Sequence, residues 1–338
     1  MSDFIKKYIP QKLDELNYNK YLIPNLKNII NDPEMSHIIF YGPSNSGKKT
    51  IVNAFLREKY TIDNLKKYNE NIKVSNSNII DVTYYSSQSH FIIDPSEYNI
   101  YDKIVIQILI KNIAKTKKVN LESFKIILIL NSHKLSYEAQ SSLRRTFEIY
   151  SNNCRFILIT NTLSKIIKPL SSRTMKFRCG LPNNSDLKLF INKVLFDNNY
   201  IMNDIEINNI IKKSNKNIET TILILELLIK FNKNINEIIL PIKHEIEICN
   251  YIINSKNISE FLNYKKLLYK KIINNIEPSQ IIINITNELI KYLNEEQKKK
   301  CIELSAKYEH LMINGSKEFF YLETLIIKLY KIFNLYNN

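Results

Sequence analysis

Glycine is so scarce in this chain that the positions where it occurs restrict the fold. The sequence of 338 residues has 4 glycines, and two of them, Gly42 and Gly47, lie within one short stretch. Glycine is favoured where the backbone takes a positive φ or approaches another group closely. An apolar run at residues 38–41 precedes the stretch and predicts a strand, and residues 50–58 predict a helix. The two glycines therefore indicate a tight strand–loop–helix connection.

This connection has the residue spacing of a phosphate-binding loop. Its candidate nucleotide-binding residues are Gly42, Pro43, Ser44, Asn45, Ser46, Gly47, Lys48, Lys49 and Thr50. The backbone N–H groups of such a loop point at phosphate oxygens, and Lys48 is expected to reach the terminal phosphates. The hydroxyl residue that normally follows this lysine and binds Mg²⁺ is replaced by Lys49, and Thr50 comes one position late. We therefore expect ATP or ADP at a degenerate site, with Mg²⁺ coordination in doubt.

The strand that should carry catalytic acids has none. A phosphate-loop ATPase needs one carboxylate to orient Mg²⁺ and a second to polarise the attacking water. The apolar run at residues 124–130 predicts the strand concerned, and Leu130 and Asn131 stand where the two acids are expected. His133 lies two positions further on, and we interpret it as a histidine of a surface loop. The chain by itself is therefore expected to hydrolyse ATP slowly or not at all.

Apolar runs alternate with helical patterns over the first part of the chain, which predicts a parallel sheet with helices on both faces. Further strands are expected at residues 78–83, 154–160 and 174–177, and helices at residues 101–116 and 136–150. After residue 180 the strand patterns stop and helical periodicity continues, with a stop near Leu240-Pro241. We predict an α/β nucleotide-binding domain at residues 1–180, a small helical domain at residues 181–242 and an all-α domain at residues 243–338.

The chain is strongly basic, with a formal net charge of +15 at pH 7. Such a charge suits a polyanionic partner such as nucleic acid. A compositional bias toward asparagine, isoleucine and lysine explains the charge equally well, so the charge alone identifies no site. The 4 cysteines and 5 histidines are scattered without metal-ligand or disulfide spacing, and no metal site is expected. No apolar run is long enough to span a bilayer, so we expect no membrane partner.

A series of short motifs, each weak alone, follows in one order along the chain. They are Lys7-Tyr8-Ile9-Pro10, the loop in its Gly47-Lys48-Lys49-Thr50 form, Val105-Ile106-Gln107, Ala139 to Glu148, Thr160 to Pro169, Ser171-Ser172-Arg173-Thr174, Tyr308-Glu309-His310 and Gly315-Ser316-Lys317. In their order and spacing the chain resembles, nearly end to end, the small subunits of replication factor C, the eukaryotic sliding-clamp loader of the AAA+ superfamily. The last two motifs and the missing acids are similar to the subunit numbered three in animals and five in fungi.

The resemblance implies a fold, a function and a set of partners. The fold would be an α/β AAA+ domain, a small helical lid and an all-α collar that oligomerises. The partners would be the four other replication factor C subunits, the PCNA sliding clamp and primer–template DNA, in the nucleus. The function would be to help load the clamp on primer–template DNA during replication.

Roles of single residues also follow from the resemblance. Tyr8 and Pro10 belong to the first motif and join the nucleotide-binding set, and Asn161 matches the residue that senses the terminal phosphate. Arg173 takes the place of the arginine finger of the family, although Thr174 replaces the usual cysteine. A guanidinium supplied to a neighbouring subunit stabilises the charge on the transferring phosphoryl group. The alternative is an ordinary surface arginine.

Several alternatives stay open. Three roles are open for Arg144 and Arg145: the coupling of neighbouring subunits, contact with DNA phosphates, or intramolecular ion pairs. The whole chain is alternatively a catalytically inactive scaffold shared with loaders used in checkpoints or cohesion, or an independent enzyme such as a nucleotide kinase or a DNA-dependent ATPase. The missing acids and the long helical tail argue against an independent enzyme. An adaptor that has lost nucleotide binding is disfavoured because Gly42, Gly47 and Lys48 are retained.

Overall fold

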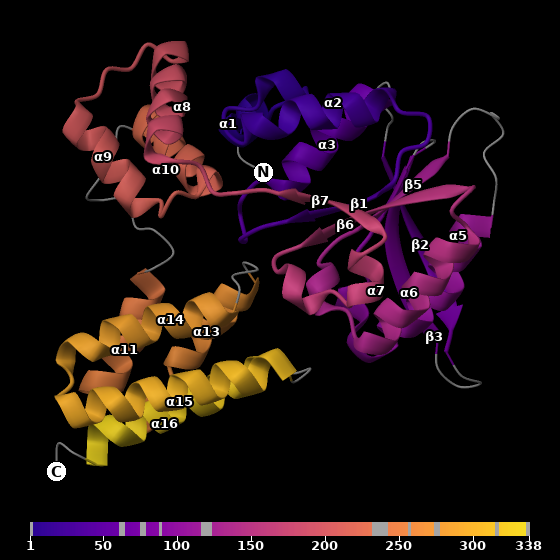
Figure 1. Ribbon diagram of the computed structural model, residues 1–338. Helices are drawn as coiled ribbons and strands as arrows, with labels where there is room; N and C mark the ends of the chain where they lie inside the picture. Colours follow the sequence, from indigo (N-terminus) through magenta and orange to yellow (C-terminus); the bar gives the residue numbers. More distant parts are fainter. Residues whose placement is uncertain are drawn as a thin grey trace. The chain divides into compact units, whose positions relative to one another are not determined.

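Nearly continuous apolar runs form the central strands of the chain's first compact unit, Met1–Ile235. The computed structural model describes residues 3–60, 65–74, 79–87, 90–115, 124–231, 243–255, 258–273, 278–314 and 318–335. The strands are β1 (His37–Tyr41), β2 (Lys66–Lys73), β3 (Ile79–Ser86), β4 (His90–Ile93), β5 (Lys125–Ile129), β6 (Cys154–Thr160) and β7 (Thr174–Arg178). They form one sheet in the order β2-β3-β4-β5-β6-β1-β7. Strands β4, β5, β6, β1 and β7 run parallel, and β2 and β3 extend the sheet as antiparallel strands at one edge (Figure 1).

Helices cover both faces of the sheet because its central strands are apolar on both sides. Along β1, Ile38 and Phe40 join the core that is covered by α2 (Ile23–Asn31) and α3 (Lys48–Lys59). The intervening Ile39 joins the opposite core, under α6 (Tyr137–Ile149). Figure 1 shows these helices on either side of the strands. The expected α/β architecture is confirmed.

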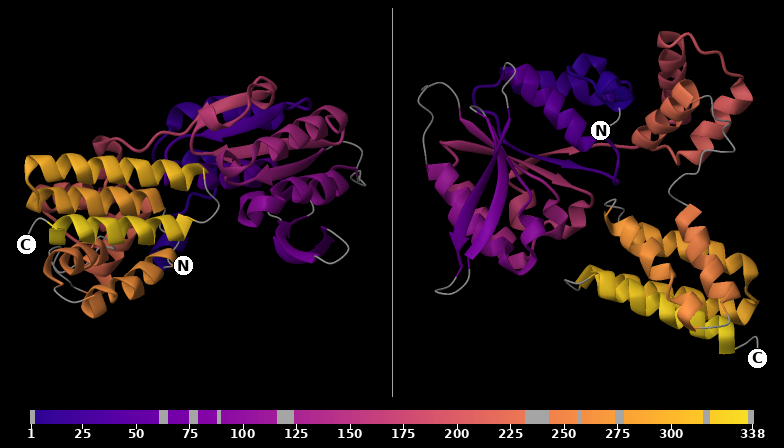
Figure 2. Two further views of the ribbon diagram at one scale, coloured as in Figure 1. Left: turned by 90° about the horizontal axis from the view of Figure 1, so that it is seen from below. Right: turned by 180° about the vertical axis from the view of Figure 1, so that it is seen from behind.

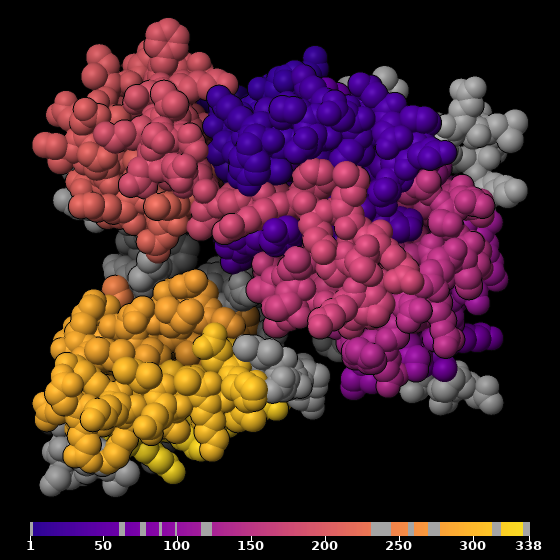
Figure 3. Space-filling view, in the orientation of Figure 1, coloured from indigo at the N-terminus to yellow at the C-terminus, as the bar shows by residue number. Residues whose placement is uncertain are grey.

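A second group of helices follows the sheet. The remaining helices of this unit are α1 (Asp3–Tyr8), α4 (Asp102–Val105), α5 (Lys111–Lys115), α7 (Lys168–Ser171), α8 (Asn184–Asp197), α9 (Asp204–Lys213) and α10 (Ile218–Phe231), and a π-helical stretch, Ile106–Ile110, joins α4 to α5. Helix α10 contacts α1, where the Lys230 ammonium lies 3.1 Å from the Asp3 carboxylate. In Figure 3 the indigo N-terminal segment abuts the helices that follow β7.

The second compact unit, Asn236–Asn338, is helical throughout its described secondary structure. Its helices are α11 (Lys243–Asn254), α12 (Ile258–Phe261), α13 (Tyr264–Ile273), α14 (Pro278–Leu289), α15 (Glu295–Asn314) and α16 (Glu318–Leu335). They enclose one apolar core that includes Ile248, Tyr264, Ile285 and Leu325, and Figure 2 shows the long helices lying side by side. The expected all-α C-terminal region is confirmed. Across the described residues, no helix is both long and apolar enough to cross a membrane.

The structure differs from the sequence-based expectation at several elements. The sequence pattern does not predict β2, which reads KKYNENIK and is exposed except at Ile72, nor the four-residue β4. Strand β2 is held by pairing with β3 rather than by an apolar signal of its own, and the apolar run of β4 is only four residues long. Helix α3 begins at Lys48 rather than Thr50 because Gly47 adopts the left-handed conformation, with φ of 74°, at its N-cap.

The division into three domains at residues 180 and 242 stays a prediction. Strand β7 ends at Arg178 and α8 begins at Asn184, but α8, α9 and α10 belong to the same compact unit as the sheet. The predicted stop near Leu240-Pro241 and the motif at residues 315–317 lie outside the described residues.

Candidate nucleotide-binding site

The candidate phosphate loop connects β1 to α3, and its two glycines are required by close contacts. A Cβ atom on Gly42 would lie 1.9 Å from the backbone carbonyl oxygen of Cys179, which follows β7. A Cβ atom on Gly47 would lie 1.9 Å from the hydroxyl oxygen of Tyr18, and that hydroxyl donates a hydrogen bond to the Ser46 carbonyl at 3.1 Å. The loop is therefore packed between the end of β7 and the N-terminal segment.

Lys48 is turned into the loop that precedes it. Its ammonium donates hydrogen bonds to the backbone carbonyl oxygens of Gly42 and Pro43 at 2.8 and 2.6 Å, and the side chain is buried. Because α3 begins at this residue, the positive end of its dipole lies at the same place. The loop thus concentrates positive charge where phosphate groups bind in proteins with this connection.

An acid that follows the neighbouring strand contacts Asn131, which stands where a catalytic acid is expected after β5. Asn131 follows β5 in the left-handed conformation, with φ of 46°, and its amide donates a hydrogen bond to the carboxylate of Asp94, which follows β4. Burial and the charge of Asp94 raise the pKa of Glu97, whereas Lys49 opposes this shift. Negative charge therefore lies at this edge of the sheet, close to Lys49. Asp94 is not among the residues predicted from the sequence, although it directly follows the apolar residues 91–93, as an acid at the end of a strand would.

His133 is buried, so its interpretation as a surface histidine is wrong. Its side chain is 8% exposed, and Nδ1 accepts a hydrogen bond from the backbone N–H of Asn161 at 3.3 Å. Burial, followed by the charges of Lys134, Lys165 and Lys48, lowers the pKa of His133 to about 4. The imidazole is neutral near pH 7 and is a weak base, which argues against a role as general base. Among the described residues, Nε2 has no hydrogen-bond partner.

Two desolvated histidines, the buried His133 and the partly buried His37, should make the protein sensitive to acid. Burial, with a smaller contribution from Arg155, also lowers the pKa of His37 to about 4. A histidine in the unfolded chain titrates near pH 6.5. Each histidine that stays neutral in the fold therefore contributes fully to the free energy of unfolding above this pH, and this contribution is lost as the pH falls toward 4. We expect a loss of about 1 to 2 kcal/mol per histidine at about pH 5, measured by urea unfolding. In the double variant His37→Asn/His133→Asn, the free energy of unfolding should depend less on pH in this range. An unchanged pH dependence would contradict the expectation.

The other candidate nucleotide-binding residues lie apart from one another. Asn161 follows β6 and lies next to His133. It is at the same end of the parallel strands as the phosphate loop, because the last residues of β6 and β1 pair with each other. Tyr8 ends α1, and its hydroxyl accepts a hydrogen bond from the Asn198 amide at 2.8 Å, while its ring packs edge-on against Phe190 of α8. The contacts of Tyr8 therefore join the N-terminal segment to the helices after the sheet, and Pro10 lies two residues after the end of α1.

Arg173 and the phosphate loop lie at opposite ends of the parallel strands. It directly precedes β7, whose first residue pairs with His37 and whose last residue pairs with Tyr41 of the parallel strand β1. The loop follows Tyr41, so the length of these strands, roughly 15 Å, separates Arg173 from the loop along the sheet. The guanidinium is exposed, donates to the Pro169 carbonyl at 2.8 Å and pairs with Glu148 at 2.9 Å. Arg173 cannot serve the loop of its own chain from this position.

A phosphate loop after the first strand of a largely parallel sheet, with helices on both faces, is the arrangement of an α/β nucleotide-binding domain of the phosphate-loop class. Residues 243–337 match the family model described as "Replication factor C subunit 3, C-terminal domain", and residues 18–181 match "DNA polymerase III, delta subunit". The chain is 30% identical over 344 residues to replication factor C subunit 5 of Schizosaccharomyces pombe, covering 98% of this chain and 96% of that protein. It is 30% identical over 343 residues to replication factor C subunit 3 of Arabidopsis thaliana, covering 98% and 97%. The chain belongs to the replication factor C subunit 3/5 family, and the resemblance noted in the sequence is confirmed.

Proposed function

We propose that this chain is a small subunit of the nuclear sliding-clamp loader, which assembles with the four other replication factor C subunits. It would help to place the PCNA clamp on primer–template DNA during replication. Its own loop would hold ATP or ADP with little hydrolysis, and Arg173 would act on the ATP of a neighbouring subunit. The main support for the proposal is that Arg173 and the loop lie at opposite ends of the parallel strands β7 and β1.

The residues around the loop support this division of roles. Gly42 and Gly47 allow the close-packed backbone of the loop and Lys48 supplies positive charge, so phosphate groups can be bound there. At the end of β5, Leu130 and Asn131 offer no carboxylate that could orient Mg²⁺ or activate water. Binding without efficient turnover is the consequence. Net positive charge favours a nucleic-acid partner for the assembled complex.

Nucleotide binding should be measurable with the full-length chain alone and should depend on Lys48. We expect Lys48→Ala to weaken ADP and ATP binding by about 10-fold or more, because it removes a charged partner of the phosphates. Lys212→Ala, which removes an exposed lysine from the far helix α9, is the matched control and should leave the dissociation constant unchanged. Isothermal titration measures binding, and phosphate release measures turnover.

Two results would contradict the proposal. Turnover of ATP by the isolated chain at the rate of an ordinary AAA+ ATPase would favour an independent enzyme. Absence of nucleotide binding by the folded wild-type chain would favour a scaffold or adaptor that has lost its nucleotide. Co-expression with the other four subunits tests assembly separately, and failure of the chain to enter the five-subunit complex would contradict the clamp-loader role.

A further inference from the structure

One carboxylate, that of Glu148, is shared by two arginines on the face that carries Arg173. Glu148 lies in the last turn of α6, and its Oε1 atom accepts from Nη2 of Arg173 at 2.9 Å and from Nε of Arg144 at 3.1 Å. Arg173 also donates through Nη1 to the Pro169 carbonyl at 2.8 Å. The guanidinium of Arg173 is therefore held at two points by its own chain.

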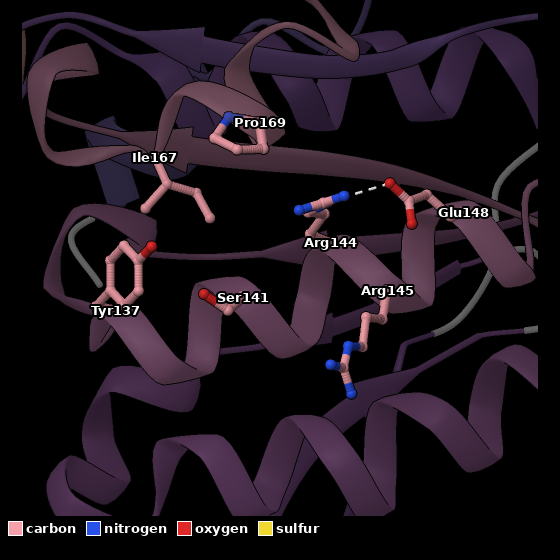
Figure 4. Close-up of a pocket in the computed structure, with 7 residues that line it drawn as sticks. All are labelled: Tyr137, Ser141, Arg144, Arg145, Glu148, Ile167 and Pro169. Atoms are coloured by element: carbon pink, nitrogen blue, oxygen red, sulfur yellow. Dashed lines mark hydrogen bonds and ion pairs between the residues drawn. The ribbon is translucent and has the colours of Figure 1, made fainter.

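These groups lie around a cavity of about 280 Å³ whose lining includes Arg144, Arg145, Glu148 and Pro169 (Figure 4). Figure 4 shows the side chains of α6 on one side of the cavity and Ile167 and Pro169 on the other. Because Arg173 binds two of the lining residues, its guanidinium lies at the rim. One carboxylate among three guanidiniums leaves the rim positively charged, which suits an anionic group of a partner.

The ion pair between Arg173 and Glu148 is too exposed to stabilise the fold appreciably. The side chains are 41% and 39% exposed, and exposed ion pairs contribute little to folding. The contact does restrict the orientation of a long side chain that otherwise samples many rotamers. It also neutralises repulsion between Arg144 and Arg173, which bind the same oxygen atom. The effect expected from this geometry is orientation of Arg173 rather than stability.

We infer that Glu148 is a positioning residue, which holds the Arg173 guanidinium in the orientation that engages the phosphate of a neighbouring subunit. This inference rests on the proposed role of Arg173. Preorganisation of a charged donor lowers the barrier because the donor need not be ordered during the reaction. The unshared N–H groups of Arg173 remain available to the partner, while the contacts with Glu148 and Pro169 fix the plane of the guanidinium.

The test is a double-mutant cycle in the assembled five-subunit complex, with ATP turnover measured in the presence of clamp and primer–template DNA. We expect Glu148→Gln to lower kcat by about three- to tenfold with little change in KM, and Glu148→Asp to restore part of the rate. In an Arg173→Ala background, Glu148→Gln should have no further effect. Glu138→Gln is the matched control, because Glu138 lies on the same helix and forms an exposed ion pair with Lys103.

The outcomes separate this inference from the proposed function. If Arg173→Ala slows turnover but Glu148→Gln behaves like Glu138→Gln, the positioning role is wrong and the finger stands. If the effects of Glu148→Gln and Arg173→Ala multiply, Glu148 does not act through Arg173. A faster rate in Glu148→Gln would also overturn the inference, since the carboxylate would then restrain the finger. If Arg173→Ala itself has no effect, the proposed function of Arg173 fails first. Assembly of each complex is verified by size-exclusion chromatography.

Discussion

Replacement of Arg173 with alanine should slow ATP turnover at the neighbouring site of the assembled complex by about 10³-fold or more. The reason is that a guanidinium supplied in trans stabilises the charge that spreads over the transferring phosphoryl group, and alanine offers no donor. Arg173→Lys should recover little of the rate, because an ammonium is a point charge without the planar fork of a guanidinium. The measurement is single-turnover hydrolysis by the five-subunit complex with clamp and DNA.

The matched control is Arg178→Ala, which removes an exposed arginine from the other end of the same strand, β7. This variant should keep the wild-type rate. Equal rates for Arg173→Ala and the wild-type complex would reduce Arg173 to a surface arginine. A loss that appears equally in both variants would indicate a general effect of charge on assembly or DNA binding.

Replacement of Gly42 with alanine should destabilise the first compact unit by about 3 kcal/mol or more and abolish nucleotide binding. The new Cβ would lie 1.9 Å from a backbone carbonyl oxygen, that of Cys179, and 2.9 Å from the carbonyl carbon. Relief requires a shift of the connection after β7 or of the loop itself, because a backbone atom cannot rotate aside as a side chain can. Urea unfolding and a nucleotide titration measure the two effects.

Two other glycines provide graded controls for this prediction. In Gly180→Ala the nearest atom to the new Cβ would be Asn19 Oδ1 at 3.7 Å, which is an ordinary contact, so we expect little change in stability. In Gly47→Ala the Cβ would meet the movable hydroxyl of Tyr18, but φ of 74° adds strain, so an intermediate loss is expected. Equal stabilities for the Gly42 and Gly180 variants would show that the close approach at Gly42 is relieved without cost.

The sequence predicts the central part of the fold because its signals are local and strong. The apolar runs that become β5 and β6 are buried on both faces, as the pattern of a parallel strand requires. The weak signals failed for a physical reason. Strand β2 is exposed except at Ile72 and is held by antiparallel pairing with the next strand, β3, and backbone pairing of this kind leaves no apolar pattern in the residues of β2.

In the candidate site, too, local signals in the sequence identify some residues, whereas contacts between distant residues leave no such signal. The spacing of Gly42, Gly47 and Lys48 identifies the loop, because each residue meets a local requirement of backbone conformation or charge. The contact of Asp94 with Asn131 could not be predicted because the two residues are 37 positions apart in sequence and follow different strands. The burial of His133 was misjudged because a neutral, desolvated imidazole cannot be distinguished from an exposed one by residue type.

The α/β class, the phosphate loop, the absence of acids after β5 and the membership of the family can all be recognised in the sequence, because they depend on residue identity and short spacing. The positions of the charged groups relative to one another follow from the folded arrangement instead. The parallel register of β1 and β7 separates Arg173 from the loop, and the end of α6 brings Glu148 to Arg173. Distances between side chains on different elements depend on how those elements pack, and packing is a property of the whole folded unit.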